Sequence, residues 1–230
     1  MKLLLIIPAY NEQDNIERVI ETVKRDCPQY DYLIVNDGSR DNTENICRKK
    51  GYHFVSHPVN LGLAAAVQTG MLYAYENGYD AAIQFDGDGQ HDPDYIEKMS
   101  REIEKGNNIV IGSRFVTEKK PKSLRMLGSN MIQFAIKLTT GKTIKDPTSG
   151  MRMFDRKMIK KLAFAADLGP EPDTVALLVR CGATFSEIQV EMHDRVAGES
   201  YLNFANSVNY MTRMIVSILI LQWFRKGQYK

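Results

Sequence analysis

The stretch MKLLLIIPAYNE (residues 1–12) contains a short apolar run that stops at Pro8. An apolar run of this length that ends at a proline is typical of a buried strand. Asn11 or Asp14 is then placed to cap a helix. The apolar residues of that helix recur on one side, at Ile16, Val19, Ile20 and Val23. The start of the chain therefore predicts a strand, a polar turn and an amphipathic helix.

The stretch YLIVNDGSRDNT (residues 32–43) repeats this design. It predicts a strand at Tyr32–Val35, a polar turn at Asn36–Ser39 and a helix that ends near Gly51. Strands followed by polar turns and helices indicate an α/β sheet, in which ligands bind at the carboxyl ends of the strands.

The segment QFDGDGQHDP (residues 84–93) places Asp86 and Asp88 two apart at the end of another apolar run. The intervening glycines let the backbone turn tightly, so that both carboxylates and the Gln90/His91 pair converge on one cation. Hard oxygen ligands suit Mg²⁺ or Mn²⁺ better than zinc, and such an ion keeps open positions for substrate phosphates. The pattern favours a metal site that binds a diphosphate. The alternative is a plain Asp-Gly turn, because this spacing of aspartates is common.

The composition limits the remaining possibilities. A chain of 230 residues fits one globular domain, and a net charge of +2 argues against wholesale binding of nucleic acid. Cys27, Cys47 and Cys181 have neither metal-site spacing nor an obvious disulfide framework, so a reducing cytoplasm is the simplest setting. We interpret the first apolar run as a strand because it is too short for a signal peptide.

Seven motifs follow one another in an order that resembles the family 2 inverting glycosyltransferases, and most closely their dolichyl-phosphate mannose synthase and polyprenyl-phosphate group. They are PAYNE (8–12), NDGS (36–39), NLGLAAAVQTG (60–70), DGDGQHDP (86–93), GSR (112–114), DPTSGMR (146–152) and DRVAGES (194–200). Seven ordered motifs are far more specific than one. The resemblance implies a GT-A catalytic domain over residues 1–201, which is a Rossmann-like nucleotide-diphospho-sugar transferase fold with a mixed sheet flanked by helices.

The resemblance also implies an activity. This is the metal-dependent, inverting transfer of a hexose from a UDP- or GDP-linked sugar to a polyprenyl phosphate, for the synthesis of cell-envelope glycans or glycoconjugates. One alternative is transfer to the hydroxyl group of a carbohydrate. Another is a non-catalytic subunit that binds a nucleotide sugar within a membrane complex. A nicotinamide dehydrogenase is disfavoured, because no G-x-G-x-x-G follows the first strand.

The motifs assign residues to the donor side of the site. The expected metal ligands for Mg²⁺ or Mn²⁺ are Asp86, Asp88 and Gln90. Asp37 is expected to accept a hydrogen bond from the base imide, which uracil and guanine both offer. The nucleotide-sugar-binding residues implied by the resemblance are Pro8, Ala9, Tyr10, Glu12, Asp37, Asp86, Gly87 and Asp88.

The acceptor side is assigned to Arg114, Arg125 and Ser129, which the resemblance matches to contacts with the acceptor phosphate. The alternative for the basic segment around Arg125 is an ordinary solvated loop. A phosphate monoester is already largely dianionic at neutral pH, so no strong general base is required. The catalytic residues implied are Asp88, Arg114, Asp173 and Arg195. Asp173 has two readings, as a group that orients the sugar or acts as a base, and as a charge at a helix N-terminus.

Residues 202–230 form a C-terminal tail beyond the catalytic motifs, with an amphipathic or apolar helix. Its apolar run MIVSILIL (214–221) is followed by Trp223, Phe224 and basic residues, and it is too short to span a bilayer. We expect this helix to lie at the membrane surface or on a partner, either a small membrane protein or a second copy of the chain. The alternative is a helix that folds back into the core. The first option predicts an enzyme that is peripheral at the cytoplasmic, inner face of the membrane.

Overall fold

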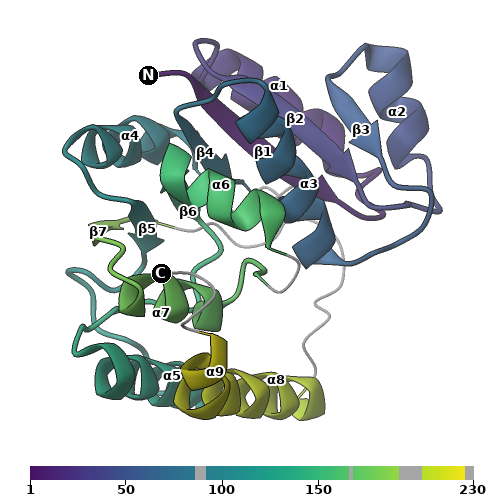
Figure 1. Cartoon of the computed structure of the whole chain (residues 1–230). Coiled ribbons are helices and arrows are strands. Elements are labelled where there is room, and N and C mark those ends of the chain that lie inside the picture. Colours follow the sequence, from purple (N-terminus) through teal and green to yellow (C-terminus); the bar gives the residue numbers. More distant parts are fainter. Residues whose placement is uncertain (86–91, 166–167, 192–203, 226–230) are drawn as a thin grey trace.

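The computed structural model describes residues 1–85, 92–165, 168–191 and 204–225, and it describes only the backbone of Leu124, Arg125 and 204–208. Within these residues a seven-stranded sheet has the strand order β3-β2-β1-β4-β6-β5-β7 (Figure 1). Neighbouring strands are parallel except around β6, which is antiparallel to both β4 and β5. The expected mixed sheet of the GT-A class is confirmed. The strands are β1 (Leu3–Ala9), β2 (Asp31–Asn36), β3 (Phe54–Ser56), β4 (Ala81–Gln84), β5 (Ile109–Ser113), β6 (Arg152–Asp155) and β7 (Phe185–Gln189).

Helices cover both faces of the sheet, as the alternation of side chains in β1 requires. Leu4 and Ile6 belong to a core that includes residues of α3 (Leu63–Glu76) and α6 (Arg156–Phe164). Leu3, Leu5 and Ile7 belong to a second core with residues of α1 (Ile16–Asp26), α2 (Thr43–Lys50) and α4 (Ile96–Glu104). Because successive side chains of a strand point to opposite faces, one apolar run supplies both cores.

The predicted strand–turn–helix units are confirmed, and one detail of the first is wrong. Helix α1 begins after Asn15, and neither Asn11 nor Asp14 caps it. Asn11 instead adopts a left-handed conformation with φ 56°, and its side-chain oxygen accepts a hydrogen bond from the backbone N–H of Arg40 at 2.8 Å. The asparagine therefore joins the two polar turns that follow β1 and β2. Helix α2 ends at Gly51 in the left-handed conformation, as expected.

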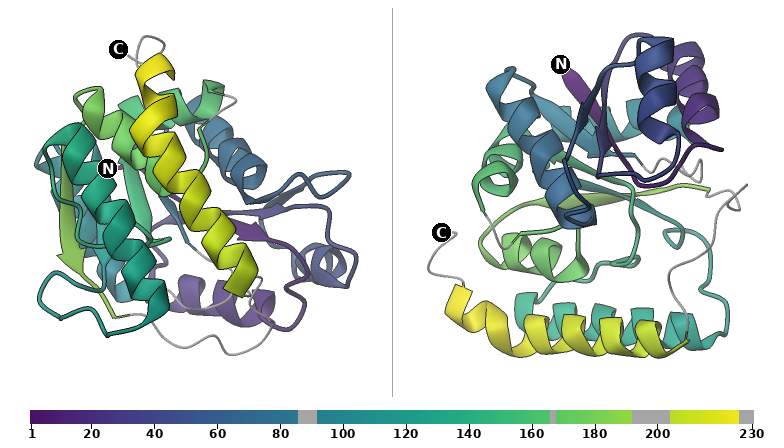
Figure 2. Two further views of the ribbon diagram at one scale, coloured as in Figure 1. Left: turned by 90° about the horizontal axis from the view of Figure 1, so that it is seen from below. Right: turned by 90° about the vertical axis from the view of Figure 1, so that its right-hand side faces the viewer.

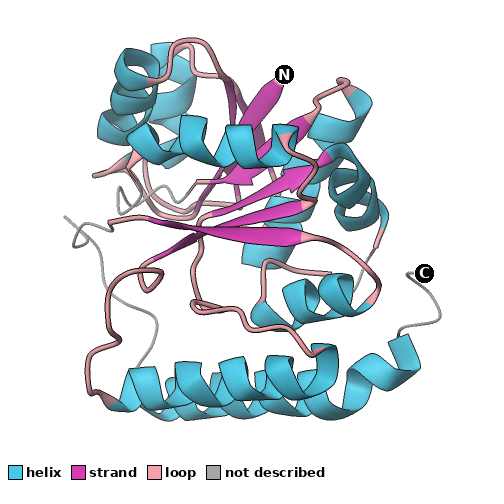
Figure 3. Ribbon diagram, turned by 90° about the vertical axis from the view of Figure 1, so that its left-hand side faces the viewer, coloured by secondary structure: helices cyan, strands magenta, loops and turns pink. Residues whose placement is uncertain are grey.

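A layer of helices forms the base of the molecule (Figures 1 and 2). Helix α5 (Leu124–Thr140) lies beside a C-terminal segment made of α8 (Phe204–Val216), a π-helical turn η2 (Ser217–Leu221) and α9 (Gln222–Arg225). Helix α7 (Pro172–Arg180) and the short 3₁₀ turn η1 (Pro93–Tyr95) complete the helices of the described chain. Figure 3 shows α7 between the sheet and the two base helices.

The C-terminal segment packs against the rest of the chain on one side only. Met214, Ser217, Ile218 and Gln222 are buried. A Cβ atom on Gly128 of α5 would lie 1.7 Å from the Met211 sulfur, so the glycine allows the two base helices to approach closely. The inner side of this segment is thus buried, as in the alternative of a helix that folds back into the core, while Val216, Ile220, Trp223 and Phe224 on its outer side are exposed. No helix of the described residues is long and apolar enough to cross a membrane.

Candidate active site

The strand register brings the polar turns to one edge of the sheet. Ala9 at the end of β1 pairs with Asn36 at the end of β2, and β1 also pairs with the end of β4. Strand β6 runs the other way, so Arg152 at its start lies between Gln84 and Ile111, near the ends of β4 and β5. The loop before β6 therefore joins the carboxyl ends of the parallel strands, where α/β proteins bind ligands.

Several predicted residues lie outside the described part of the chain. They are Asp86, Gly87, Asp88, Gln90 and Arg195. The description stops at Phe85, whose backbone N–H donates to the carbonyl of Ile6 at 2.9 Å. Phe85, the last residue described before these positions, therefore lies beside β1 at the edge that collects the other motifs. Among the residues that are described, no group of three or more His, Cys, Asp or Glu side chains could hold a metal ion.

The residues predicted to line the nucleoside pocket lie together at the carboxyl ends of β1 and β2 and just after them. Asp37 donates its backbone N–H to the carbonyl of Ala9 at 2.8 Å, which fixes the two turns to each other. Pro8, Tyr10 and Glu12 are partly exposed beside this contact. Glu12 also takes part in the start of α1, because its carboxylate accepts a hydrogen bond from Asn15 at 2.8 Å.

The carboxylate of Asp37 is buried and holds the loop that leads to α3. It accepts hydrogen bonds from the backbone N–H groups of Leu61 at 2.9 Å and Gly62 at 2.7 Å, and it contacts Nδ1 of His57 at 2.8 Å. Two of these three partners are on Oδ1 and one is on Oδ2. Since a carboxylate offers about four lone-pair positions, Oδ2 can accept one more donor.

Gly38 makes this arrangement possible. Its φ is +64°, and a Cβ atom there would lie 2.3 Å from the backbone of Val59. Any larger residue would therefore push the loop away from Asp37.

Arg114 and Asp146 form an ion pair below the same edge. The guanidinium of Arg114 donates to Asp146 through Nε at 2.7 Å and through Nη2 at 2.9 Å, and its backbone N–H adds a third contact. Asp146 is fully buried, and Arg114 is partly exposed. Burial raises the pKa of Asp146, but the hydrogen bonds and charge of Arg114 outweigh this effect and hold the pKa below its usual value. The pair fixes the orientation of the arginine predicted to contact phosphate.

Ser129 lies on the inner side of α5, with 1% of its surface exposed. The ammonium of Lys120 donates to its hydroxyl at 3.3 Å and to Gln133 at 3.0 Å. Burial lowers the pKa of Lys120, while the charges of Asp146 and Glu187 act in the opposite direction. Arg125 and Ser129 both belong to α5. The sequence-based assignment omitted Lys120, although it belongs to the same basic segment.

Asp173 lies in the first turn of α7, and its carboxylate bonds to the C-terminal segment. Ser217 donates to it at 2.5 Å, and Arg225 lies 3.5 Å from the same oxygen. The backbone carbonyl of Asp173 accepts a further hydrogen bond from Gln222 at 2.8 Å. These contacts join α7 to the tail.

A buried polar chain connects the site edge with the same tail. Arg152 is 2% exposed and donates to the carbonyls of Pro170 at 2.7 Å and Pro147 at 2.8 Å. Burial lowers its pKa, and the nearby Tyr210 and Glu171 raise it. Tyr210 of α8 donates to Glu171 at 2.6 Å. The sequence-based assignment omitted Arg152, although this arginine is the last residue of the DPTSGMR motif.

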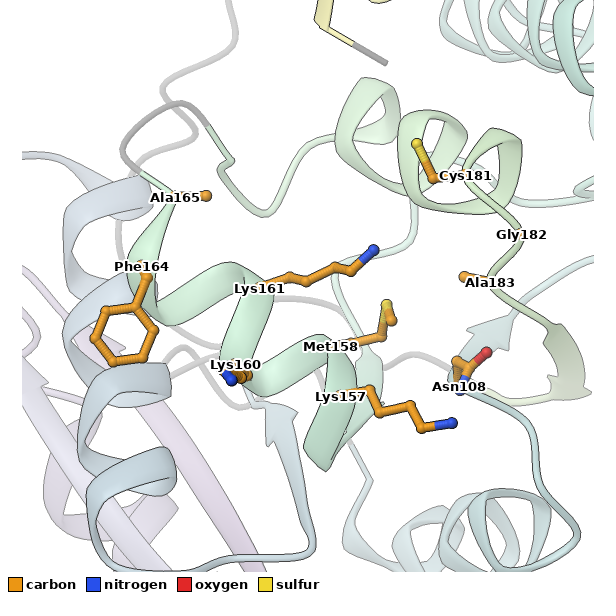
Figure 4. Close-up of a pocket in the computed structure, with 10 residues that line it drawn as sticks. All are labelled: Asn108, Lys157, Met158, Lys160, Lys161, Phe164, Ala165, Cys181, Gly182 and Ala183. Carbon is orange, nitrogen blue, oxygen red and sulfur yellow. The ribbon is translucent and has the colours of Figure 1, made fainter. Parts of the chain in front are cut away.

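The cavity in Figure 4 has a volume of about 790 Å³ and lies at the opposite edge of the sheet. It is bordered by Asn108 before β5, by Ala183 before β7 and by lysines of α6. None of the predicted site residues lines it. Since ligands of α/β sheets bind at the carboxyl ends of strands, we do not assign the nucleotide sugar to this cavity.

The chain is similar to known glycosyltransferases. The model of the family described as "Glycosyl transferase family 2" matches residues 4–163. A UDP-N-acetylglucosamine–dolichyl-phosphate N-acetylglucosaminyltransferase of Methanococcus voltae is 33% identical over 70% of this chain and 72% of that protein. A polyprenol monophosphomannose synthase of Mycolicibacterium smegmatis is 26% identical over 89% of this chain and 82% of that protein.

Similarity to solved structures extends over the whole fold. The crystal structure of glucosyl-3-phosphoglycerate synthase from Mycobacterium tuberculosis in complex with Mn²⁺, UDP and phosphoglyceric acid has a TM-score of 0.67 and 18% identity. The alignment covers 96% of this chain and 78% of that one. At this identity the likeness concerns the fold, which is the mixed sheet and its flanking helices.

Proposed function

Because this chain belongs to glycosyl transferase family 2, we propose that it moves one hexose from a UDP- or GDP-linked sugar to a polyprenyl phosphate. The observation that carries this proposal is the match to enzymes named for that acceptor class, one named for dolichyl phosphate and one for polyprenol. The proposed product belongs to the synthesis of cell-envelope glycans or glycoconjugates. The proposed catalytic domain is residues 1–201, with 202–230 as a tail for association with the membrane.

We assign the donor nucleotide to the carboxyl ends of β1 and β2. Asp37 supports this assignment, because the remaining lone pair on Oδ2 suits the single imide N–H of a uracil or guanine. Pro8, Ala9 and Tyr10 border the same turn, and Glu12 is assigned to the ribose hydroxyls. The three contacts that Asp37 already makes hold its carboxylate in place before the nucleotide arrives.

The donor diphosphate is assigned to the turn after β4. Asp86, Asp88 and Gln90 offer carboxylate and amide oxygens, a donor set that fits Mg²⁺ or Mn²⁺. When bound, such an ion neutralises charge on the leaving diphosphate. A crystal structure of the same fold contains Mn²⁺ and UDP together, which supports a divalent ion in this role. Arg195 is assigned to the same diphosphate.

The acceptor phosphate is assigned to the basic groups near the start of α5. Arg114 is held by Asp146 through Nε and Nη2, and among the described residues no partner bonds to its Nη1. Lys120 and Ser129 supply an ammonium and a hydroxyl nearby, and Arg125 belongs to the first turn of the same helix as Ser129. Clustered donors of this kind suit a phosphate dianion.

The chemical step that follows needs no strong base. An oxygen of the acceptor phosphate attacks the anomeric carbon on the side opposite the nucleoside diphosphate, so the configuration inverts. The acceptor is already ionised at neutral pH. Asp173 is engaged by Ser217 and Arg225, and in this arrangement we give it a positioning role rather than that of a base.

The test is to incubate the full chain with UDP- and GDP-linked sugars, a polyprenyl phosphate and Mg²⁺ or Mn²⁺, and to measure release of the nucleoside diphosphate. We expect release that depends on both the lipid phosphate and the metal. Asp88→Asn should lose most of this activity, because one carboxylate of the diphosphate site is removed. Asp14→Asn, at an exposed position outside the site, is the matched control. Release that requires a carbohydrate hydroxyl instead of the lipid would contradict the proposal.

A further inference from the structure

Helix α5 has a row of large apolar side chains on its outer surface. Leu127, Met131, Phe134 and Leu138 recur at intervals of three and four residues, so they share one face of the helix. Phe134 and Leu138 are each 67% exposed, and Leu127 and Met131 are more than half exposed. A contiguous row of exposed apolar side chains is typical of an interaction surface.

The C-terminal segment has a second row of the same kind. Val216, Ile220, Trp223 and Phe224 follow helical spacing and point away from the buried side. Trp223 is 64% exposed and Phe224 is 81% exposed. The Trp223 ring also stacks on the guanidinium of Arg180 at 3.6 Å, which places an aromatic ring beside a cation at the surface.

The two rows face the same direction. Ile132, Ala135 and Ile136 of α5 and Met214 and Ile218 of the tail belong to one buried core with residues of α7. Because both helices bury their inner sides against the same layer, their outer sides point away from it together. Figure 2 shows the two helices side by side along the base, and Gly128 allows their close approach. We name the two exposed rows together the apolar platform.

The sequence segments that contain the apolar platform are strongly basic. Segments 119–145 and 201–230 contain 11 of the 30 Lys and Arg residues of the chain and none of its 28 Asp and Glu residues. The rest of the chain therefore has 19 basic and 28 acidic residues. A nearly neutral protein thus separates into an acidic body and a basic, apolar base.

We infer that the apolar platform docks on the surface of an anionic lipid bilayer, with α5 and the C-terminal segment lying in the plane of the interface. Exposed apolar side chains beside lysine and arginine suit the boundary between acyl chains and anionic headgroups. Tryptophan and phenylalanine at the chain end add to this match. A second copy of the chain is a poorer occupant, because it would bring a second positive surface with no carboxylates to pair with.

The role of this docking in catalysis rests on the proposed function, because it concerns how the acceptor phosphate reaches the site. Ser129 lies on the inner side of the same helix that presents Phe134 outward. A bilayer beneath α5 therefore places Ser129 and Lys120 next to the level at which a polyprenyl phosphate carries its phosphate. The hydrogen bonds of Tyr210 with Glu171 and of Ser217 with Asp173 fix the position of the tail on the proposed catalytic domain.

The test is cosedimentation of the full chain with vesicles of neutral lipid and with vesicles that contain about one third anionic lipid. We expect binding to the anionic vesicles, weakened by added salt. Phe134→Glu on α5 and Trp223→Glu on the tail should each lower binding at least about tenfold, because each replaces a membrane-facing ring by a charge. Phe164→Glu is the matched control, since Phe164 is also exposed but lies on α6. Circular dichroism checks that each variant is folded.

Three results would overturn the docking. These are equal loss of binding in the Phe164→Glu control, no binding of the wild type to protein-free vesicles, and a dimer in solution that Phe134→Glu dissociates. The proposed function is tested separately, in a turnover assay with a short, water-soluble polyprenyl phosphate as acceptor. Phe134→Glu should retain turnover on this acceptor while losing vesicle binding. Vesicle binding without any turnover by the wild type would leave the docking intact and reject the proposed transfer.

Discussion

At the scale of single residues, the pair of Arg114 and Asp146 gives the first prediction. Asp146→Asn removes the charge that orients Arg114 and leaves that guanidinium without its partner. We expect the free energy of unfolding to fall by about 3 kcal/mol at pH 7, as for other broken buried pairs. The sugar-transfer rate should fall as well, because Arg114 is assigned to phosphate. Urea unfolding and steady-state kinetics measure the two effects.

The same ion pair predicts how the difference in free energy of unfolding between wild type and Asp146→Asn depends on pH. The pKa of Asp146 is lowered in the folded state, so its contribution to stability is complete above its usual value of 3.8 and is lost as the pH falls through the lower, folded value. The gap between wild type and Asp146→Asn should therefore be constant near neutrality and shrink only below about pH 3.8. Asp14→Asn, an exposed carboxylate, is the control. A gap that closes already near pH 6 would show that another group titrates.

Lys120 gives a kinetic prediction at the same scale. Lys120→Met keeps the length of the side chain and removes the ammonium that contacts Ser129. The apparent KM for the lipid phosphate should rise about tenfold, and the KM for the nucleotide sugar should change little, because the lost charge-assisted contact belongs to the acceptor. Lys119→Met, at the exposed neighbouring position, is the matched control. Equal effects of the two variants on the KM for the lipid phosphate would indicate that the basic segment is an ordinary solvated loop with no role in binding the acceptor.

At the scale of elements, the local design of the chain was predictable and its long-range pairing was not. The first strands, the polar turns and the end of α2 at Gly51 follow from short patterns of apolar residues and glycine. The reversed direction of β6 depends on pairing with β4 and β5, which the pattern of its own four residues does not encode. The capping role expected for Asn11 failed for a similar reason, because its partner Arg40 belongs to the next turn.

The same limit applies to the candidate site. Pro8, Ala9, Tyr10 and Asp37 lie at one edge because the carboxyl ends of neighbouring parallel strands meet there, and short motifs are enough to place residues at strand ends. The motifs did not indicate that Asp173 pairs with Ser217, because 44 positions separate the two residues and neither lies in a distinctive pattern. Contacts of that kind depend on how helices pack, and periodicity describes each helix alone.

The hydrogen bond between Ser217 of the tail and Asp173 of α7 predicts how strongly the tail is held on the rest of the chain. Ser217→Ala removes the donor that lies 2.5 Å from the buried carboxylate of Asp173. We expect a loss of about 1–3 kcal/mol, the usual effect of leaving a buried acceptor with fewer partners. Hydrogen exchange measured by mass spectrometry should be faster in residues 210–225 and unchanged in β1 and β2. Asn209→Ala, at an exposed position of α8, is the control, and equal exchange in both variants would contradict this prediction.

At the scale of the whole molecule, the proposed catalytic site and the apolar platform proposed to contact the membrane are neighbouring parts of one body. The carboxyl edge of the sheet collects the donor motifs, and the basic, apolar base carries the residues assigned to the acceptor phosphate. Helix α5 belongs to both, since its inner side presents Ser129 and its outer side presents Phe134. The proposed catalytic domain and tail therefore differ in their sequence motifs but are not separate in space. The tail packs on the domain through Tyr210, Ser217 and Gln222.

The most direct measurement of the central claim follows the phosphorus of the acceptor itself. Polyprenyl phosphate, the nucleotide sugars, metal and the full chain are incubated together, and the lipid fraction is analysed by ³¹P NMR and mass spectrometry. We predict that the monoester resonance is replaced by that of a phosphodiester, with the mass of one added hexose, and that Asp88→Asn loses most of this conversion. An unchanged monoester, with the sugar recovered on a hydroxyl group or as free sugar, would contradict it.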